Sequence, residues 1–138
     1  MNDLTSLSDT IRLSVHILAA SIWVGGQEVV GSAVGALRRN HHDALNPLAR
    51  SFGRVAWPAY ALVVLTGMWS LAVIDVTQTS TGYQVATLIK VLVALASGAA
   101  ATVHSYGSSK VAKAFGGAVA SLTAVASLVL GVLIRAGA

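Results

Sequence analysis

Four ionisable residues lie inside long apolar segments of this 138-residue chain, namely His16, Glu28, Lys90 and His104. An ionisable group placed in hydrocarbon costs on the order of 3 kcal/mol on insertion scales, so such residues usually serve a function or a specific pairing. Imidazole suits copper ions and haem iron, and a lysine ammonium pairs with anions. These four residues are therefore the first candidates for chemistry.

The composition places these residues in a membrane protein. Hydrophobic residues make up 55% of the chain, charged residues 10%, and the mean hydropathy is +0.74. Soluble domains carry about 25% charged residues, so this chain has too few to cover a surface that faces water. The net charge of +4 comes without a basic run interleaved with aromatics, which argues against a nucleic-acid partner. Because cysteine is absent, disulfides, thiolate metal sites and cysteine nucleophiles are excluded.

Four apolar segments reach the roughly 20 residues that a membrane-crossing helix needs. They cover roughly residues 12–37, 55–74, 83–106 and 114–134. Short connections make consecutive spans antiparallel neighbours. The predicted fold is therefore a single domain, an all-α, integral membrane, up-down four-helix bundle that contacts the lipid bilayer. We expect the first span to be retained, because its apolar run is longer than that of a signal peptide.

Basic residues are concentrated in two of the three connections. The first connection carries Arg38, Arg39, Arg50 and Arg54, and the third carries Lys110 and Lys113. Positively charged connections stay in the cytoplasm. The sequence thus predicts that both termini lie on the outer, non-cytoplasmic side of the membrane. We take this membrane to be a bacterial plasma membrane.

The first connection has two further features. Asn46-Pro47 is predicted to break it, and residues 48–55 to extend the second helix inward. His41 and His42 are adjacent, and neighbouring residues on a helix do not face each other. We therefore expect this histidine pair to lie in a solvated connection.

The rise of a helix, 1.5 Å per residue, sorts the candidates by depth. His16, Lys90 and Met68 are each expected one to two turns below the outer end of their helix. His104 lies about 21 Å beyond Lys90 along the axis, so His16 and His104 are not expected to share one ion. Glu28 and His104 belong to a deeper layer, where they are predicted to form a relay, with Arg54 as a third candidate member.

Helical angles sort the same residues by face. His16, Trp23, Gln27 and Val34 form one stripe, and a second stripe contains Lys90, Ser97, Ala101, His104 and Ser108. Both stripes are candidates for the bundle interior. Three other features are interpreted as structural. Gly31-x-x-x-Gly35 permits close helix packing, and the fourth span serves as a scaffold. Trp57, Tyr60 and Trp69 form an aromatic belt at the membrane interfaces.

The run VHILAASIWVGG, from Val15 to Gly26, resembles the first helix of the copper resistance protein D family. The segment LIKVLVALASGAA is similar to the lysine-led third helix of that family, and Gly67 in LTGMW to a glycine of its second helix. The residues that carry the resemblance are His16, Trp23, Gly25, Gly26, Gly67 and Lys90. The resemblance implies copper handling. Because imidazole suits copper, the candidate metal ligands are His16 with Met68, or His104 alone.

The His-helix and Lys-helix arrangement also resembles, more distantly, the membrane protoporphyrinogen oxidases that bind haem b. That resemblance implies His16 as an axial ligand, with Lys90 and Trp23 at the cofactor. The segment QEVVGSAVGALRR stands here in place of the hydrophobic-Pro-Arg segment of those oxidases.

Three hypotheses follow from the sequence. The first is copper transport or handling through a site inside the bundle. The second is a haem b redox protein or oxidase, in which Lys90 pairs with a propionate or acts as a second ligand. The third is a non-catalytic subunit or assembly factor that forms homo-oligomers or joins other membrane subunits. The chain carries no P-loop, G-x-S-x-G or H-E-x-x-H motif, and whether it is an enzyme stays open.

Overall fold

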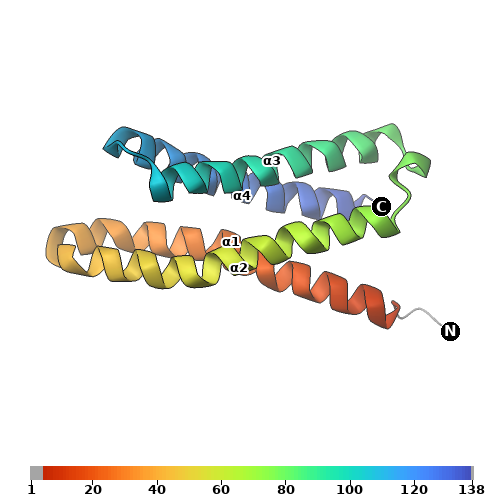
Figure 1. Ribbon diagram of the computed structural model, residues 1–138. Coiled ribbons are helices and arrows are strands. Elements are labelled where there is room, and N and C mark those ends of the chain that lie inside the picture. The colour runs from red at the N-terminus through yellow and green to blue at the C-terminus, as the bar shows by residue number, and fades with distance from the viewer. Residues whose placement is uncertain (1–4, 138) are drawn as a thin grey trace. The chain divides into compact units, whose positions relative to one another are not determined.

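The structure is a computed structural model that describes residues 5–137. Within that range it consists of helices and their connections. The elements are α1 (Leu7–Asn40), the short 3-10 helix η1 (His42–Ala44), α2 (Leu45–Val73), a second 3-10 helix η2 (Val76–Gln78), α3 (Thr81–Tyr106) and α4 (Lys110–Ala136) (Figure 1). All four α-helices are long and apolar enough to cross a membrane. The all-α fold class and the membrane prediction are confirmed.

Serine side chains start three of the helices. Ser6, Ser80 and Ser109 accept hydrogen bonds from the backbone N–H of Asp9, Tyr83 and Ala112, respectively. A serine at this position satisfies an N–H group that has no partner within the helix. The helix starts are therefore encoded locally, next to the apolar runs that follow them.

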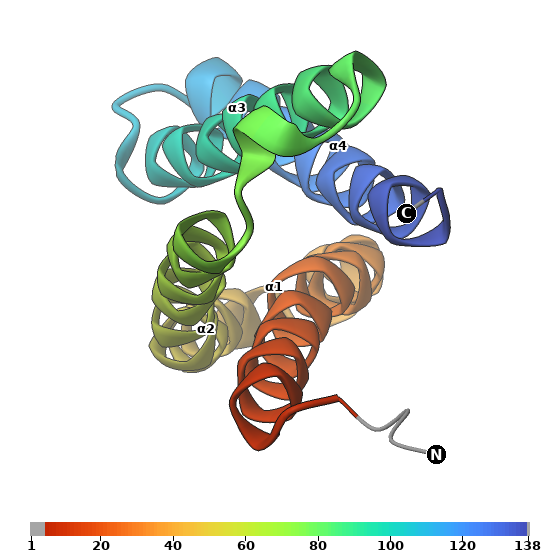
Figure 2. The ribbon, with the colours of Figure 1, turned by 90° about the vertical axis from the view of Figure 1, so that its right-hand side faces the viewer.

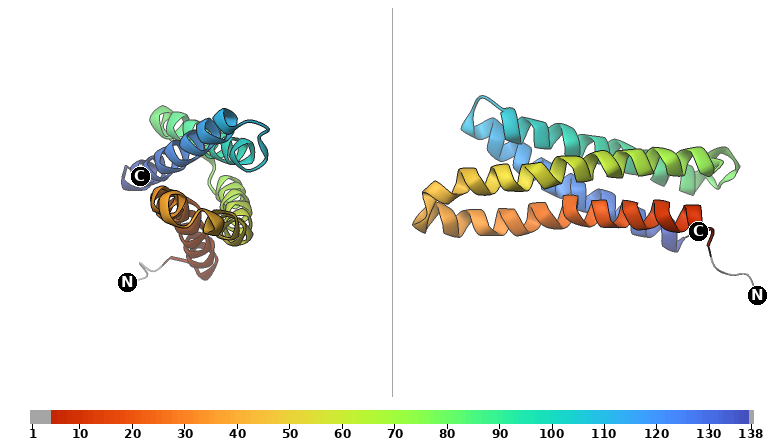
Figure 3. Two further views of the ribbon diagram at one scale, coloured as in Figure 1. Left: turned by 90° about the vertical axis from the view of Figure 1, so that its left-hand side faces the viewer. Right: turned by 60° about the horizontal axis from the view of Figure 1, so that its bottom comes forward.

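The chain divides into two compact units, Met1–Ile74 and Asp75–Ala138. We call them the N-terminal hairpin and the C-terminal hairpin. In the first, α1 and α2 run side by side in opposite directions, and in the second α3 and α4 do the same. Figure 2 shows the two helices of each pair closer to end-on, and Figure 3 shows the short connection between α3 and α4.

Small residues fill the contact between the helices of each pair. Ala19, Ala56 and Ala59 are buried in the N-terminal hairpin, and Gly116, Ala120 and Ala124 in the C-terminal hairpin. Large apolar side chains such as Leu18, Leu65, Leu122 and Val132 are instead more than 60% exposed. Membrane helices pack through small residues because lipid solvates the large apolar ones. This distribution is the one expected of helices surrounded by lipid.

The first connection differs from its prediction. The prediction that Asn46-Pro47 breaks it is wrong, because α2 begins at Leu45 and both residues lie in its first turn. A proline is tolerated there, since the N–H groups of a first turn have no partner within the helix. The chain turns instead at His41 and η1, where both histidines are exposed as expected.

The helices also extend further than the apolar segments predicted. α1 continues to Asn40, and α2 begins ten residues before the predicted start at Val55, so the inward extension of α2 is confirmed. A hydropathy pattern marks only the apolar part of a helix. Because the added turns carry many polar residues, the pattern does not include them. Pro58 also lies within α2 without ending it.

Candidate functional site

Polar side chains connect α1 and α2 near the start of the N-terminal hairpin. Arg12 is 5% exposed, and its guanidinium pairs with Asp9 at 2.7 Å and donates to Ser70 Oγ at 2.5 Å. Ser70 Oγ in turn donates to the backbone carbonyl of Thr66 at 2.9 Å. We call the set of Asp9, Arg12, His16, Thr66 and Ser70 the polar seam.

His16 is held in this seam by Thr66. Its Nδ1 lies 2.7 Å from Thr66 Oγ1, and that hydroxyl donates its own hydrogen to the carbonyl of Leu62 at 2.6 Å. When the single hydroxyl hydrogen of Thr66 is directed to the Leu62 carbonyl, the Thr66 oxygen accepts from His16, and Nδ1 of His16 then carries the ring proton. The lone pair of the neutral ring then lies on Nε2. A ring N–H bonded to an oxygen is the usual second interaction of a metal-ligating histidine.

Gly67, the glycine of the LTGMW segment, lies beside this imidazole. A Cβ added at Gly67 would lie 4.0 Å from His16 Cε1, which is an ordinary van der Waals distance. The ring therefore does not require a glycine at this position.

An aromatic cluster lies two turns along α1 from His16. The ring centroid of Trp23 is 4.5 Å from that of Tyr60 and 5.6 Å from that of Trp57, which are distances typical of packed aromatic pairs. Trp23 is 5% exposed, whereas Trp69 is 41% exposed. Trp57 and Tyr60 thus pack on Trp23 between α1 and α2, an arrangement that the aromatic-belt interpretation did not predict.

Met68 does not lie on the same side of α2 as Thr66. Met68 is two positions after Thr66, which turns its side chain by about 200° around the helix. Met68 is accordingly 61% exposed, and Thr66 is 5% exposed. The N-terminal hairpin therefore does not bring Met68 to His16.

Lys90 and His104 both contact α4 in the C-terminal hairpin. A Cβ added to Gly131 would lie 3.0 Å from Lys90 Nζ, and one added to Gly117 would lie 2.7 Å from His104 Nδ1. His104 Nδ1 also donates to the carbonyl of Lys113 at 2.7 Å. The two ionisable side chains, fourteen residues apart on α3, thus occupy notches at two glycines that are fourteen residues apart on α4.

Ser97 lies between these two contacts. It is 1% exposed and donates from Oγ to the carbonyl of Ala120 at 2.9 Å. The predicted stripe of Lys90, Ser97 and His104 therefore does face a neighbouring helix, and the same holds for His16 and Trp23 on α1.

Several candidates lie elsewhere. Glu28 is on an exposed face of α1. A Cβ at Gly31 or Gly35 would meet no heavy atom within 4 Å, so the Gly31-x-x-x-Gly35 motif does not form the α1–α2 contact. Asp75 accepts two hydrogen bonds from Thr77 and caps η2. Among the described residues, no group of three or more His, Cys, Asp or Glu is placed to hold a metal ion.

Four members of the polar seam are not among the residues that the sequence singles out, namely Asp9, Arg12, Thr66 and Ser70. A signal was present, because Arg12, His16, Ala19 and Trp23 follow the 4-3-4 spacing of one helix face. The residues Ala59, Thr66 and Ser70 follow a matching spacing on α2.

Comparison with known proteins finds no match to a family model, to a curated protein or to a solved structure. What the described site can do therefore has to be argued from its own side chains. Those side chains are an imidazole hydrogen-bonded to a threonine, a buried guanidinium and an aromatic cluster.

Proposed function

We propose that the protein handles copper ions in the membrane and that His16 is the imidazole ligand at which an ion is received. The observation that carries this proposal is the hydrogen bond between His16 Nδ1 and Thr66 Oγ1. It fixes the ring and directs the lone pair of neutral His16 to Nε2, and imidazole nitrogen is a good copper ligand.

His104 is the second imidazole of this proposal. Its Nδ1 donates to the Lys113 carbonyl, so the lone pair of the neutral ring again lies on Nε2. His104 lies two residues before the end of α3, and His16 lies nine residues after the start of α1. The two rings therefore suit successive stations near opposite membrane surfaces more than a shared site, and a single imidazole per station suits transfer more than storage.

A haem b protein is the second candidate, and the aromatic cluster favours it. One axial histidine can hold haem iron, and flat aromatic side chains such as Trp23 and Trp57 pack well against a macrocycle. In this candidate His16 would be the axial ligand of the haem iron. Haem would supply one-electron chemistry there.

We further propose that both termini lie outside a bacterial plasma membrane. Four crossing helices return the chain to the side from which it starts, and the connections that carry Arg38, Arg39, Lys110 and Lys113 are expected in the cytoplasm. Because the chain has no cysteine, single cysteines report the topology cleanly. A membrane-impermeant maleimide added to whole cells should label Gln78→Cys and not Ser108→Cys. The reverse pattern would reject this orientation.

The test of function compares copper and haem on the same purified protein. Wild type, His16→Gln and the control His42→Gln are purified in detergent, their absorption spectra recorded, and copper(I) binding measured against a competing chelator. The copper proposal expects colourless protein in which His16→Gln lowers copper affinity and His42→Gln does not. A Soret band that is lost in His16→Gln would replace it with the haem candidate. If neither variant changes either property, the protein is better explained as a subunit that docks partner helices.

Lys90 separates the two candidates further. Its ammonium would repel a bare cation, so Lys90→Met should leave copper loading intact or improve it. A bound cofactor that is weakened, or whose absorption band shifts, in Lys90→Met would instead support the haem candidate. Weaker copper loading together with an unchanged haem spectrum in Lys90→Met would contradict this role of Lys90.

A further inference from the structure

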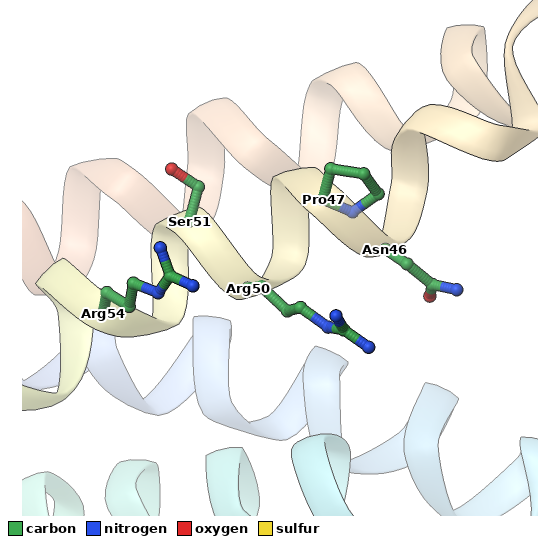
Figure 4. A pocket seen from close by; sticks show the side chains of 5 residues that line it. All are labelled: Asn46, Pro47, Arg50, Ser51 and Arg54. Atoms are coloured by element: carbon green, nitrogen blue, oxygen red, sulfur yellow. The ribbon is translucent and has the colours of Figure 1, made fainter.

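Two hollows lie next to each other on the surface of the N-terminal hairpin. The first has a volume of about 490 Å³ and is lined by Asn46, Pro47, Arg50, Ser51 and Arg54 (Figure 4). The second has a volume of about 460 Å³, lies between α1 and α2, and is lined mainly by apolar residues, including Val15, Leu18, Ile22, Pro58 and Leu62. Arg54 lines both. Both volumes are in the range of small-ligand sites.

The two hollows form one continuous strip along α2. Asn46, Arg50, Arg54, Pro58 and Leu62 follow one another at intervals of four residues, so each is a neighbour of the next on the helix surface, and the row winds gradually around α2 toward α1. The strip is polar and basic at its start and apolar from Pro58 onward. In the first hollow the side chains of Arg50 and Arg54 project from the same stretch of α2 (Figure 4).

The change from basic to apolar occurs at the depth of a membrane boundary. Arg54 lies nineteen residues before Val73, the last residue of α2, which is about 28 Å along the axis. The hydrocarbon core of a bilayer is about 30 Å thick. If Val73 lies at one boundary of the core, Arg54 lies at the other and Arg50 lies about 6 Å further out, in the headgroup layer.

We propose that this strip binds one anionic phospholipid, with the headgroup phosphate between Arg50 and Arg54 and an acyl chain along the apolar hollow. Guanidinium groups bind phosphate oxygens through paired, charge-assisted hydrogen bonds. Ser51 and Asn46 supply further hydrogen-bonding groups at the same level. None of the residues that line the two hollows is acidic.

The apolar hollow argues for a lipid rather than a soluble phosphate. A free phosphate would use only the basic end, whereas the strip continues past Arg54 over two further turns, to Leu62. The cytoplasmic leaflet of a membrane is also rich in anionic lipids. Its headgroups would meet the arginine end of this strip in the topology proposed above, but the lipid site does not depend on copper or haem binding.

Native mass spectrometry of the full chain in detergent tests the proposal. Phosphatidylglycerol and phosphatidylcholine with the same acyl chains are titrated against wild type, the double variant Arg50→Gln/Arg54→Gln, and the control Arg38→Gln/Arg39→Gln. Both pairs are exposed and both variants remove two positive charges from the same hairpin. We expect phosphatidylglycerol to bind wild type at least tenfold more tightly than phosphatidylcholine, and the Arg50/Arg54 variant alone to lose this preference.

Two further measurements distinguish the lipid from free phosphate. Millimolar inorganic phosphate should not displace phosphatidylglycerol, and dihexanoyl phosphatidylglycerol should bind at least tenfold more weakly than the long-chain lipid. Equal loss of binding in the control variant would overturn the site. Full displacement by phosphate, or affinity that does not depend on chain length, would overturn the role of the apolar hollow. Circular dichroism of each variant shows whether it is folded.

Discussion

The N-terminal hairpin and the C-terminal hairpin each pack two antiparallel helices together, but with different side chains at the contact. Between α1 and α2, an arginine, a histidine and two hydroxyl residues accompany the buried alanines, whereas the buried residues between α3 and α4 are glycines, alanines and one serine, with Lys90 and His104 at either end of that contact. Both pairs have the same antiparallel arrangement and similar helix lengths. The difference shows that packing alone does not require the polar seam.

Burying polar groups has a cost that small residues avoid. A buried guanidinium or imidazole must have each of its polar atoms paired, and the Nε atom of Arg12 is buried without a hydrogen-bond partner among the described residues. Helices that pack through Gly116 and Ala120 have no such requirement. We therefore interpret the polar seam as functional and the contact at Gly116, Ala120 and Ser97 as structural, and His104 and Lys90 as the candidates for function in the C-terminal hairpin.

The largest effect on stability is expected at Gly116. A Cβ at this position would lie 2.8 Å from the Ala100 carbonyl oxygen and 2.8 Å from the His104 backbone nitrogen. Backbone cannot move as a flexible side chain does, so Gly116→Val should push α3 and α4 apart and cost about 1–3 kcal/mol. Unfolding in mixed micelles, followed by circular dichroism, measures this loss.

Gly31→Val is the matched control for that prediction. It makes the same change within a helix, but no heavy atom lies within 4 Å of the added Cβ. Its stability should stay near that of wild type. An equal loss in both variants would mean that helix propensity, and not the contact between α3 and α4, determines the effect.

The next effect concerns Thr66 in the polar seam. Thr66→Val keeps the shape of the side chain but removes the acceptor of the His16 Nδ1 proton. Loss of such an outer partner typically lowers metal affinity 10–100-fold, and we expect that loss here in copper(I) binding or in haem retention. Thr123→Val is the control, because the Thr123 hydroxyl bonds only to carbonyls of its own helix. If both variants bind as wild type does, the seam is structural.

Ser97 gives the matching test in the other hairpin. Ser97→Ala removes the hydrogen bond to the Ala120 carbonyl, and interhelical hydrogen bonds in membranes contribute about 0.6 kcal/mol on average. We expect a stability loss of that size and no change in metal or haem binding. Ser32→Ala, whose hydroxyl bonds only within α1, should change neither property. A change in binding for Ser97→Ala would contradict the structural role given to Ser97.

The sequence predicts the elements better than their contacts. Apolar length identifies all four helices, and helical angles correctly place Trp23 and Ser97 on buried faces. Pairing depends on which side chains of two helices meet, and no spacing within one helix contains that information. Thus Thr66 could not be matched to His16, and Trp57 was assigned to a belt although it packs on Trp23.

Depth estimates from the sequence give the position of a residue along its helix but not its neighbours on other helices. His16 and Met68 have similar distances from the ends of their helices, which suggested one layer. Depth fixes the position along the helix axis but not the direction in which the side chain points. Met68 lies on the face of α2 that is turned away from Thr66, so equal depth did not bring it to His16.

The smallest effect on stability is expected at Gly131. This position tests whether Lys90 in the C-terminal hairpin has a role beyond packing. A Cβ there would lie 3.0 Å from Lys90 Nζ and 3.4 Å from its Cε, which are the far end of a flexible side chain. Gly131→Ala should therefore change stability by less than about 0.5 kcal/mol, since the lysine can swing aside and alanine favours the helix. It should nevertheless move the ammonium group, and the binding assay of Lys90→Met measures whether that position matters. If Gly131→Ala is as destabilising as Gly116→Ala, Lys90 is a packing residue held rigidly against α4. If it leaves stability unchanged but alters metal or haem binding as Lys90→Met does, the C-terminal hairpin contributes a positioned charge as well as a scaffold.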